Sequence, residues 1–217
     1  MIVLHRMTWH TACRGLLALA AVACAALAAA PARAEVVWWE YTGLVTAFAD
    51  PEGHLPGVNV GSPFWGRIAL DRSVPDVLPG DPTVGLYHEA IQEALVVLPG
   101  YSGTGPLGLT NVVHVSNGYL GGDYFNAQTD ITAGSLDLAF ELRLSDPTAS
   151  VFDTDGLPAE PPALGDLSYA RLVLYSQTAN INLTGALSTL QLVPEPASLL
   201  LAALAVLLLG RAGARCR

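Results

Sequence analysis

The clearest pattern in the chain is an alternation of apolar and polar positions from Ser135 to Leu144. Leu136, Leu138, Phe140 and Leu142 fall in one phase, and mainly polar residues fall in the other. Successive side chains of a β-strand point to opposite faces of a sheet. The pattern therefore predicts a strand with one buried and one solvated face.

Shorter alternating or apolar runs recur through the middle of the chain and predict further strands. They cover residues 37–48, 64–71, 95–98, 111–116, 169–177 and 180–192. In the last run the apolar phase changes, and Gly185 is expected to mark a β-bulge there. Only Val84 to Ala94 has apolar residues at helical spacing, which makes this segment a candidate helix.

The order of these elements predicts an all-β fold. Turn-forming pieces rich in Gly, Pro, Asn and Asp separate the strands, and no βαβ alternation is present. We expect an antiparallel β-sandwich or jelly-roll-like domain, flanked by an N-terminal signal helix and a C-terminal transmembrane-type helix. A closed, lipocalin-like barrel is the alternative.

The N-terminal end has the pattern of a secretory signal peptide. Arg6 and Arg14 precede an apolar run from Gly15 to Ala30, and Ala32-Arg33-Ala34 offers a small-residue cleavage site. We predict cleavage before Glu35, with cleavage after Ala30 as the alternative. Such a segment implies export through the Sec translocon and removal by signal peptidase.

The C-terminal end combines three features in a fixed order. Pro194-Glu195-Pro196 is followed by the uncharged run Ala197 to Leu209, and then by Arg211, Arg215 and Arg217. As a helix this run would be about 20 Å long, against a hydrocarbon core of about 30 Å. It predicts a short membrane helix whose arginines keep the C-terminus in the cytoplasm. An ordinary buried helix is the alternative, but it would normally show a polar face.

This arrangement resembles the PEP-CTERM sorting signal. The resemblance covers about a ninth of the chain and implies a Gram-negative bacterium in which an exosortase recognises Pro194, Glu195 and Pro196. It also implies temporary membrane retention and cleavage near that motif, commonly in bacteria that build extracellular polysaccharide. The segments 61–71, 144–147 and 157–158 are similar to pieces repeated in many uncharacterised PEP-CTERM proteins. We expect a signal peptide in 1–34, an ectodomain in 35–192 and the sorting signal in 193–217.

Charge and cysteine content narrow the functions open to the ectodomain. Residues 35–193 contain eighteen acidic residues against four arginines, a formal charge of −14, and the chain has no lysine. So acidic a surface repels phosphate backbones, which argues against nucleic-acid binding. Cys13, Cys24 and Cys216 all lie in the two end segments, so packing rather than disulfides must stabilise the domain.

Aromatic residues offer the best sequence clue to a ligand. Trp38, Trp39 and Trp65 are predicted as ligand-binding residues, because exposed aromatic rings on a sheet can stack against sugar rings. Trp38 and Trp39 are adjacent in a predicted strand and must face opposite ways. At most one of the two therefore belongs to the core if the sheet is buried on one side.

Several motifs suggest catalysis or metal binding and are weaker. Asp153-Thr154-Asp155-Gly156 resembles the first half of a calcium loop, with Asp153 and Asp155 as ligands, but it lacks the downstream bidentate Glu. The histidines His54, His88 and His114 show no zinc-binding spacing. The segments 100–104 and 103–108 approach the serine-hydrolase elbow and the dinucleotide-binding motif without matching their context. We expect no cofactor, no structural metal and no catalytic residue.

The sequence therefore predicts an exported, non-enzymatic surface or matrix protein that is sorted by its C-terminal signal and associated with extracellular polysaccharide or biofilm. It would be anchored transiently in the inner membrane and then reach the cell surface or the medium. A carbohydrate-binding module on the same scaffold is the first alternative. The second is an extracellular hydrolase using Glu89 with Glu93, or Asp123 with Asp130, as its carboxylate pair.

Overall fold

The computed structural model describes residues 36–193, apart from the side chains of 107–109, and these residues form one antiparallel β-structure. The nine strands are β1 (Val36–Ala49), β2 (Pro63–Asp71), β3 (Val84–His88), β4 (Ile91–Leu98), β5 (Tyr101–Ser116), β6 (Asp123–Ala133), β7 (Leu136–Asp146), β8 (Tyr169–Ser176) and β9 (Ile181–Val193). Two short 3₁₀ turns, Tyr119–Gly121 and Leu164–Asp166, complete the described elements.

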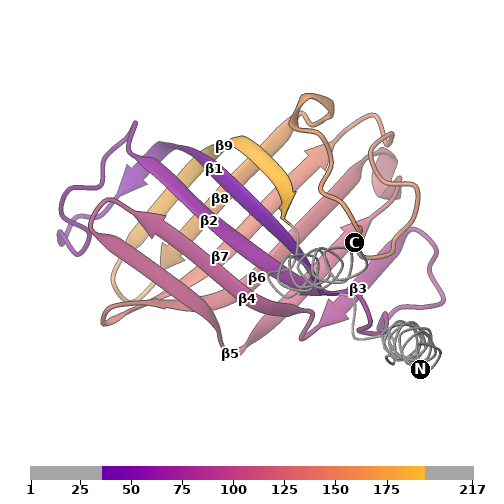
Figure 1. Ribbon diagram of the computed structural model, residues 1–217, viewed down its shortest axis with the longest axis horizontal. Helices are drawn as coiled ribbons and strands as arrows, with labels where there is room; N and C mark the ends of the chain where they lie inside the picture. The colour runs from indigo at the N-terminus through magenta and orange to yellow at the C-terminus, as the bar shows by residue number, and fades with distance from the viewer. Residues whose placement is uncertain (1–35, 194–217) are drawn as a thin grey trace, which may run out of the picture. The chain divides into compact units, whose positions relative to one another are not determined.

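The strands close into an eight-stranded barrel. Around the ring the order is β5, β4, β2, β1, β9, β8, β7 and β6, and β6 pairs again with β5. The first and last strands join through an antiparallel pairing that runs from Trp38 opposite Val193 to Ala49 opposite Asn182. Figure 1 shows β1 in indigo beside β9 in yellow. We call this β1–β9 pairing the closing seam.

The prediction of an all-β antiparallel fold is confirmed, but its sandwich or jelly-roll architecture is wrong. Two stacked sheets would leave strands at free edges, whereas here a single sheet closes on itself. Apart from β3, which pairs with β5 outside the ring, the strands follow one another around the ring in chain order, so the closed-barrel alternative describes the topology. The flanking signal and transmembrane-type helices lie outside the described residues.

The candidate helix at 84–94 is also wrong, because this segment forms β3 and the start of β4. Both strands pair with β5, and Glu89 and Ala90 interrupt them. Glu89 has a φ of 63°, and its backbone N–H donates to the Asn111 carbonyl of β5 at 2.8 Å. Asn111 Oδ1 accepts from the Ile91 backbone N–H at 3.0 Å, and Nδ2 donates to the Ile91 carbonyl at 2.8 Å.

Apolar side chains fill the interior of the barrel. Trp39 and Tyr41 of β1, Phe125 of β6 and Phe140 of β7 are fully buried there. Loops add further apolar side chains to the same core: Leu55 and Val58 come from the β1–β2 loop, and Phe152 and Leu157 from the β7–β8 loop. The interior of the barrel is therefore a packed and mainly apolar core, with a few buried polar residues such as Thr129.

Candidate functional site

One predicted ligand-binding residue, Trp39, belongs to the packed interior of the barrel. Trp39 is 0% exposed and its ring lies 5.0 Å from that of Phe125, centroid to centroid. The prediction that Trp39 contributes to a sugar-stacking surface is therefore wrong. The alternation of β1 places Trp38 on the opposite, outer face, as expected for adjacent residues in a strand.

Trp38, Arg67 and Trp65 share the outer face of β1 and β2, and we call them the tryptophan surface. The Arg67 guanidinium lies 5.1 Å from the centre of the Trp38 ring, and its Nε donates to Glu93 Oε1 at 2.6 Å. Trp65 is 44% exposed and lies opposite Thr42 of β1. Four residues of strand, or about 13 Å, separate the register positions of the two tryptophans.

The structure does not bring the candidate carboxylate pairs together as a catalytic site. Asp123 is buried at the start of β6, whereas Asp130 lies on the opposite face of the same strand. Glu93 forms an ion pair with Arg67, and Glu89 is exposed at the interruption between β3 and β4. The hydrolase alternative therefore gains no support from these residues.

Asp123 instead stabilises loops by accepting hydrogen bonds from their backbone. Its Oδ2 accepts from the backbone N–H groups of Val151 and Phe152 at 2.7 and 2.8 Å, and its Oδ1 accepts from Gly118 N–H at 2.8 Å. Asp146 faces it across β6 and β7 and accepts bonds from Thr148 and Ser150. These two carboxylates hold the start of the β7–β8 loop against the barrel.

The calcium candidate lies in the β7–β8 loop, beside a cleft of about 260 Å³. Asp153 lines this cleft together with Arg72, whose Nε donates to the Leu157 carbonyl at 2.9 Å. The backbone carbonyl of Asp155 is already an acceptor for Tyr87. An arginine brings positive charge to a place where calcium needs several anionic oxygens. Among residues 36–193, no group of three or more His, Cys, Asp or Glu side chains gathers as a metal site.

The three histidines occupy unrelated places. His88 ends β3, and His114 lies on the outer face of β5, 5.7 Å from the Tyr124 ring. Burial lowers the pKa of His114, which keeps its imidazole neutral at pH 7. His54 lies in the β1–β2 loop, where its Nε2 is 3.0 Å from Glu52 Oε2.

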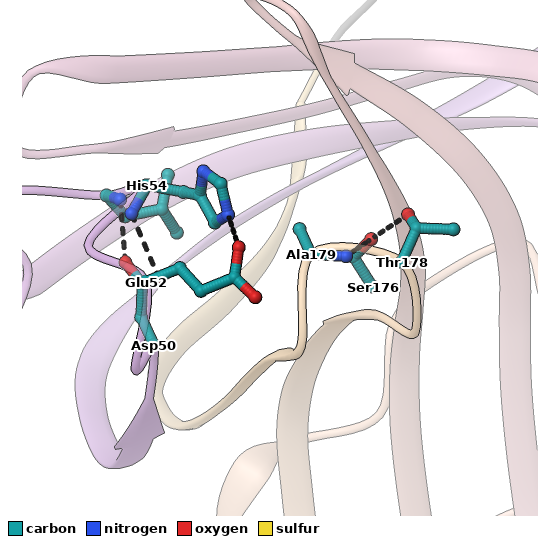
Figure 2. A network of polar contacts seen from close by, with 7 residues as sticks. Asp50, Glu52, His54, Ser176, Thr178 and Ala179 are labelled. Atoms are coloured by element: carbon teal, nitrogen blue, oxygen red, sulfur yellow. Dashed lines mark hydrogen bonds and ion pairs between the residues drawn. The ribbon is translucent and has the colours of Figure 1, made fainter.

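Figure 2 shows His54 and Glu52 near the β8–β9 turn, at one end of the barrel. Asp50 organises the loop by accepting from the backbone N–H groups of His54 and Leu55. Burial opposes its ionisation, but those hydrogen bonds and the charge of His54 lower the pKa of Asp50. On this side, a groove of about 460 Å³ is lined by His54, Tyr101, Ser102 and residues 133–136.

A second outer-face cluster was not predicted from the sequence. It consists of Tyr124 of β6, Glu141 and Arg143 of β7, and Tyr169 and Arg171 of β8, and we call it the tyrosine–arginine surface. Arg143 lies directly opposite Arg171, and Ser145 separates Tyr124 from Tyr169 in the next row of the sheet. The cluster therefore follows from the register of three neighbouring strands.

The polar groups of this surface contact one another closely. Glu141 is only 4% exposed although it faces outward, and its carboxylate forms an ion pair with Arg143. The Arg171 guanidinium lies 4.6 Å from the centre of the Tyr169 ring. No ion pair of Arg171 appears among residues 36–193. The Arg171 guanidinium is therefore held against an aromatic ring, and its positive charge has no ion-pair partner among the described residues.

Burial shapes the protonation of the surface. Desolvation raises the pKa of the Tyr124 hydroxyl, so it remains a neutral donor at pH 7. Partial burial works against the charge of Arg143, but the hydrogen bond and the charge of Glu141 raise its pKa. Arg143 therefore stays charged across the physiological range.

The alternation of β6, β7 and β8 could have assigned each of these side chains to an outer face. It could not have shown that they gather, because only the register places Arg143 beside Arg171. The strand β6 itself was not among the predicted strands, because its apolar phase contains alanines and a threonine.

The predicted sorting residues Pro194, Glu195, Pro196, Arg211, Arg215 and Arg217 lie outside the described residues. Within 36–193, no helix is long and apolar enough to cross a membrane. Comparison of the chain with models of protein families, with curated proteins and with solved structures finds no significant match in any of the three.

Proposed function

We propose that this chain is an exported, non-enzymatic surface or matrix protein that an exosortase sorts and processes through residues 193–217. The observation that carries the proposal is where the described strands begin and end. The first of them begins at Val36, just after the predicted signal-peptidase site, and the last ends at Val193, next to Pro194 in the sequence. Removing both end segments would leave all the described strands in place.

The pairing of the first and last strands supports the same reading. Trp38 lies opposite Val193, so the two borders of the domain come from neighbouring strands. In the sequence, the residue directly after β9 is a proline, which has no backbone N–H to donate to a sheet. In this proposal the apolar run 197–209 retains the protein in the inner membrane until cleavage releases the barrel.

Intact-mass spectrometry of the full chain, expressed in Gram-negative hosts with and without an exosortase, tests the proposal. We expect a mature N-terminus at Glu35 and, only in the exosortase host, loss of everything beyond the Pro-Glu-Pro region. Glu195→Gln should impair this processing. Glu160→Gln, a matched change beside the prolines 161 and 162 of an exposed loop, should not. A cytoplasmic protein that still carries Arg217 would contradict the proposal.

Carbohydrate binding by the tryptophan surface is a second candidate function. The half-exposed Trp65 ring favours it, since such a face stacks against sugars, and Arg67, which lies over Trp38 on the same surface, can bond to sugar hydroxyls. On an array of neutral glycans, Trp65→Ala should abolish binding. Leu44→Ala, which removes another exposed apolar side chain of β1, should leave it unchanged. A silent array would rule this candidate out.

A further inference from the structure

The tyrosine–arginine surface has an uneven distribution of charge. Residues 35–193 contain only four arginines among eighteen acidic residues, yet two of the four lie directly opposite one another on β7 and β8. Like charges facing each other across a strand pair destabilise a sheet. The fold itself gives no reason to place Arg143 beside Arg171.

Only one of these two charges is neutralised by the described residues. Glu141 forms an ion pair with Arg143, whereas Arg171 contacts the face of Tyr169. A guanidinium that lies on an aromatic ring keeps its N–H groups available at the edge, already oriented for a planar acceptor. Among the described residues, the Arg171 guanidinium has no anionic partner, so an anionic ligand would complete this site.

We infer that the tyrosine–arginine surface binds a carboxylated polysaccharide, with Arg171 receiving the carboxylate of a uronic acid unit. The planar fork of an arginine matches the two oxygens of a carboxylate. The half-buried Tyr124 ring lies within one row of the sheet from Arg171 and offers a flat surface to a sugar ring, whereas Arg171 covers one face of Tyr169. The hydroxyls of both tyrosines can bond to sugar hydroxyls.

The charge of the whole domain disfavours the most densely charged anions. A formal charge of −14 strongly repels polymers such as nucleic acids or polyphosphate, which carry a charge on every phosphate. A polyuronate presents one carboxylate per sugar ring, with apolar ring faces between them. The inference rests on the carbohydrate-binding candidate above for the class of ligand, but it concerns a different surface and an acidic sugar.

The test measures calorimetrically how the full-length chain, in mild detergent, binds polygalacturonate and the same polymer with its carboxylates methyl-esterified. We expect binding to the free acid, weakening as salt is raised, and no binding to the ester. Arg171→Gln should weaken binding about tenfold or more, the effect of losing a charged hydrogen bond. Arg171→Lys, which keeps the charge without the fork, should fall between the two.

Ser188→Glu is the matched control. It changes the net charge by the same amount at an exposed position of β9, and it should leave the affinity within about twofold. Equal losses in Arg171→Gln and Ser188→Glu, or equal binding of the acid and the ester, would overturn the inference. So would the absence of polygalacturonate binding by the unmodified chain.

Two further variants separate this inference from the proposed functions. Trp65→Ala should leave polygalacturonate binding intact even where it abolishes binding of neutral glycans. Glu195→Gln, which is expected to block processing, should likewise leave it intact. Loss of binding in Trp65→Ala would move the acidic ligand to the tryptophan surface and refute the assignment to Arg171.

Discussion

At the scale of single residues, glycines shape the barrel interior around one aromatic ring. Phe64 of β2 is buried between Gly43 of β1 and Gly185 of β9. A Cβ added to Gly185 would lie 2.2 Å from Phe64 Cε1, and one added to Gly43 would lie 2.3 Å from Cζ. The two missing side chains therefore provide the space that the Phe64 ring fills.

Gly185→Ala should destabilise the protein by about 1–3 kcal/mol, the usual cost of overpacking a core. Urea denaturation of the variant measures this loss. Gly80→Ala, at a loop position where an added Cβ meets nothing within 4 Å, should stay within about 0.5 kcal/mol.

Adding Phe64→Leu to Gly185→Ala should restore part of the stability, because it removes the ring that the new methyl group contacts. If Gly185→Ala were as stable as Gly80→Ala, the proposed role of this glycine would be refuted.

Gly185 also shows how closely a β-bulge can be located from the sequence. It was expected to mark a bulge, but it pairs with Val45 and with Leu172 in both neighbouring ladders. The register shifts between β1 and β9 lie elsewhere, between Thr42 and Gly43 and between Val45 and Ala47. A change of apolar phase indicates that a bulge is nearby, whereas its position depends on the partner strand.

At the scale of elements, the β7–β8 loop is tied to the barrel by Asp146. Its carboxylate accepts from the backbone N–H and the hydroxyl of Thr148 at 3.0 and 2.6 Å, and from Ser150 N–H at 3.1 Å. The Thr148 bonds come first among the causes that lower the pKa of Asp146 to about 2. The charged carboxylate is therefore the form that organises this loop.

This shift predicts acid sensitivity. A folded pKa of about 2 lies below the unfolded value of about 3.9, so the contribution to stability is complete above about pH 4. It is lost as the pH falls from about 4 to about 2. The midpoint of thermal unfolding, followed from pH 7 to pH 2, should decline over that interval.

Asp146→Asn should lower the midpoint at pH 7 and flatten the acid decline, because the amide has no charge to lose. Asp153→Asn, an exposed residue of the same loop, should reproduce the profile of the unmodified protein. An unchanged acid decline in Asp146→Asn would mean that other carboxylates cause it.

Element prediction succeeded where burial on one face produces a clean alternation. β7 was predicted from its leucines, and β1, β2, β8 and β9 within two residues of their ends. It failed for β3. Leu86, Ala90 and Ala94 are at helical spacing in the sequence, but Leu86 belongs to β3, Ala94 belongs to β4, and Glu89 and Ala90 interrupt the two strands. Asn111 of β5 bonds to Glu89 through its backbone and to Ile91 through its side chain, and these contacts from about twenty residues away leave no local pattern.

At the scale of the whole molecule, one pairing separates the barrel from the sandwich that the sequence favoured. Alternation shows that each strand has a buried face, and this holds in both architectures. The difference is whether β1 and β9 meet, a contact between residues about 150 positions apart. The candidate surfaces depend on the same information, since Arg143 and Arg171 are neighbours only through register.

The closing seam predicts where the chain can be shortened. A chain of residues 35–193 should match the full chain in its cooperative unfolding. A chain of residues 35–187 should lose about 3 kcal/mol or more, because the missing residues pair with positions 38–42, including the fully buried Trp39 and Tyr41.

Chemical denaturation of both truncated chains makes the comparison. If the chain ending at Val193 unfolded far more readily than the full chain, the apolar run 197–209 would be part of the folded core. The proposal of a removable sorting signal would then fail.

The closing seam also sets a time at which folding can finish. A ribosome makes β1 first and the thirteen residues of β9 last, so the ring stays open during almost the whole of synthesis. Until β9 is made, the sheet is open and the edge of β1 that β9 will pair with has no partner strand. Such a chain is still pliable enough to be threaded through a narrow channel, and for the same reason it is exposed to pairing with another unfinished copy.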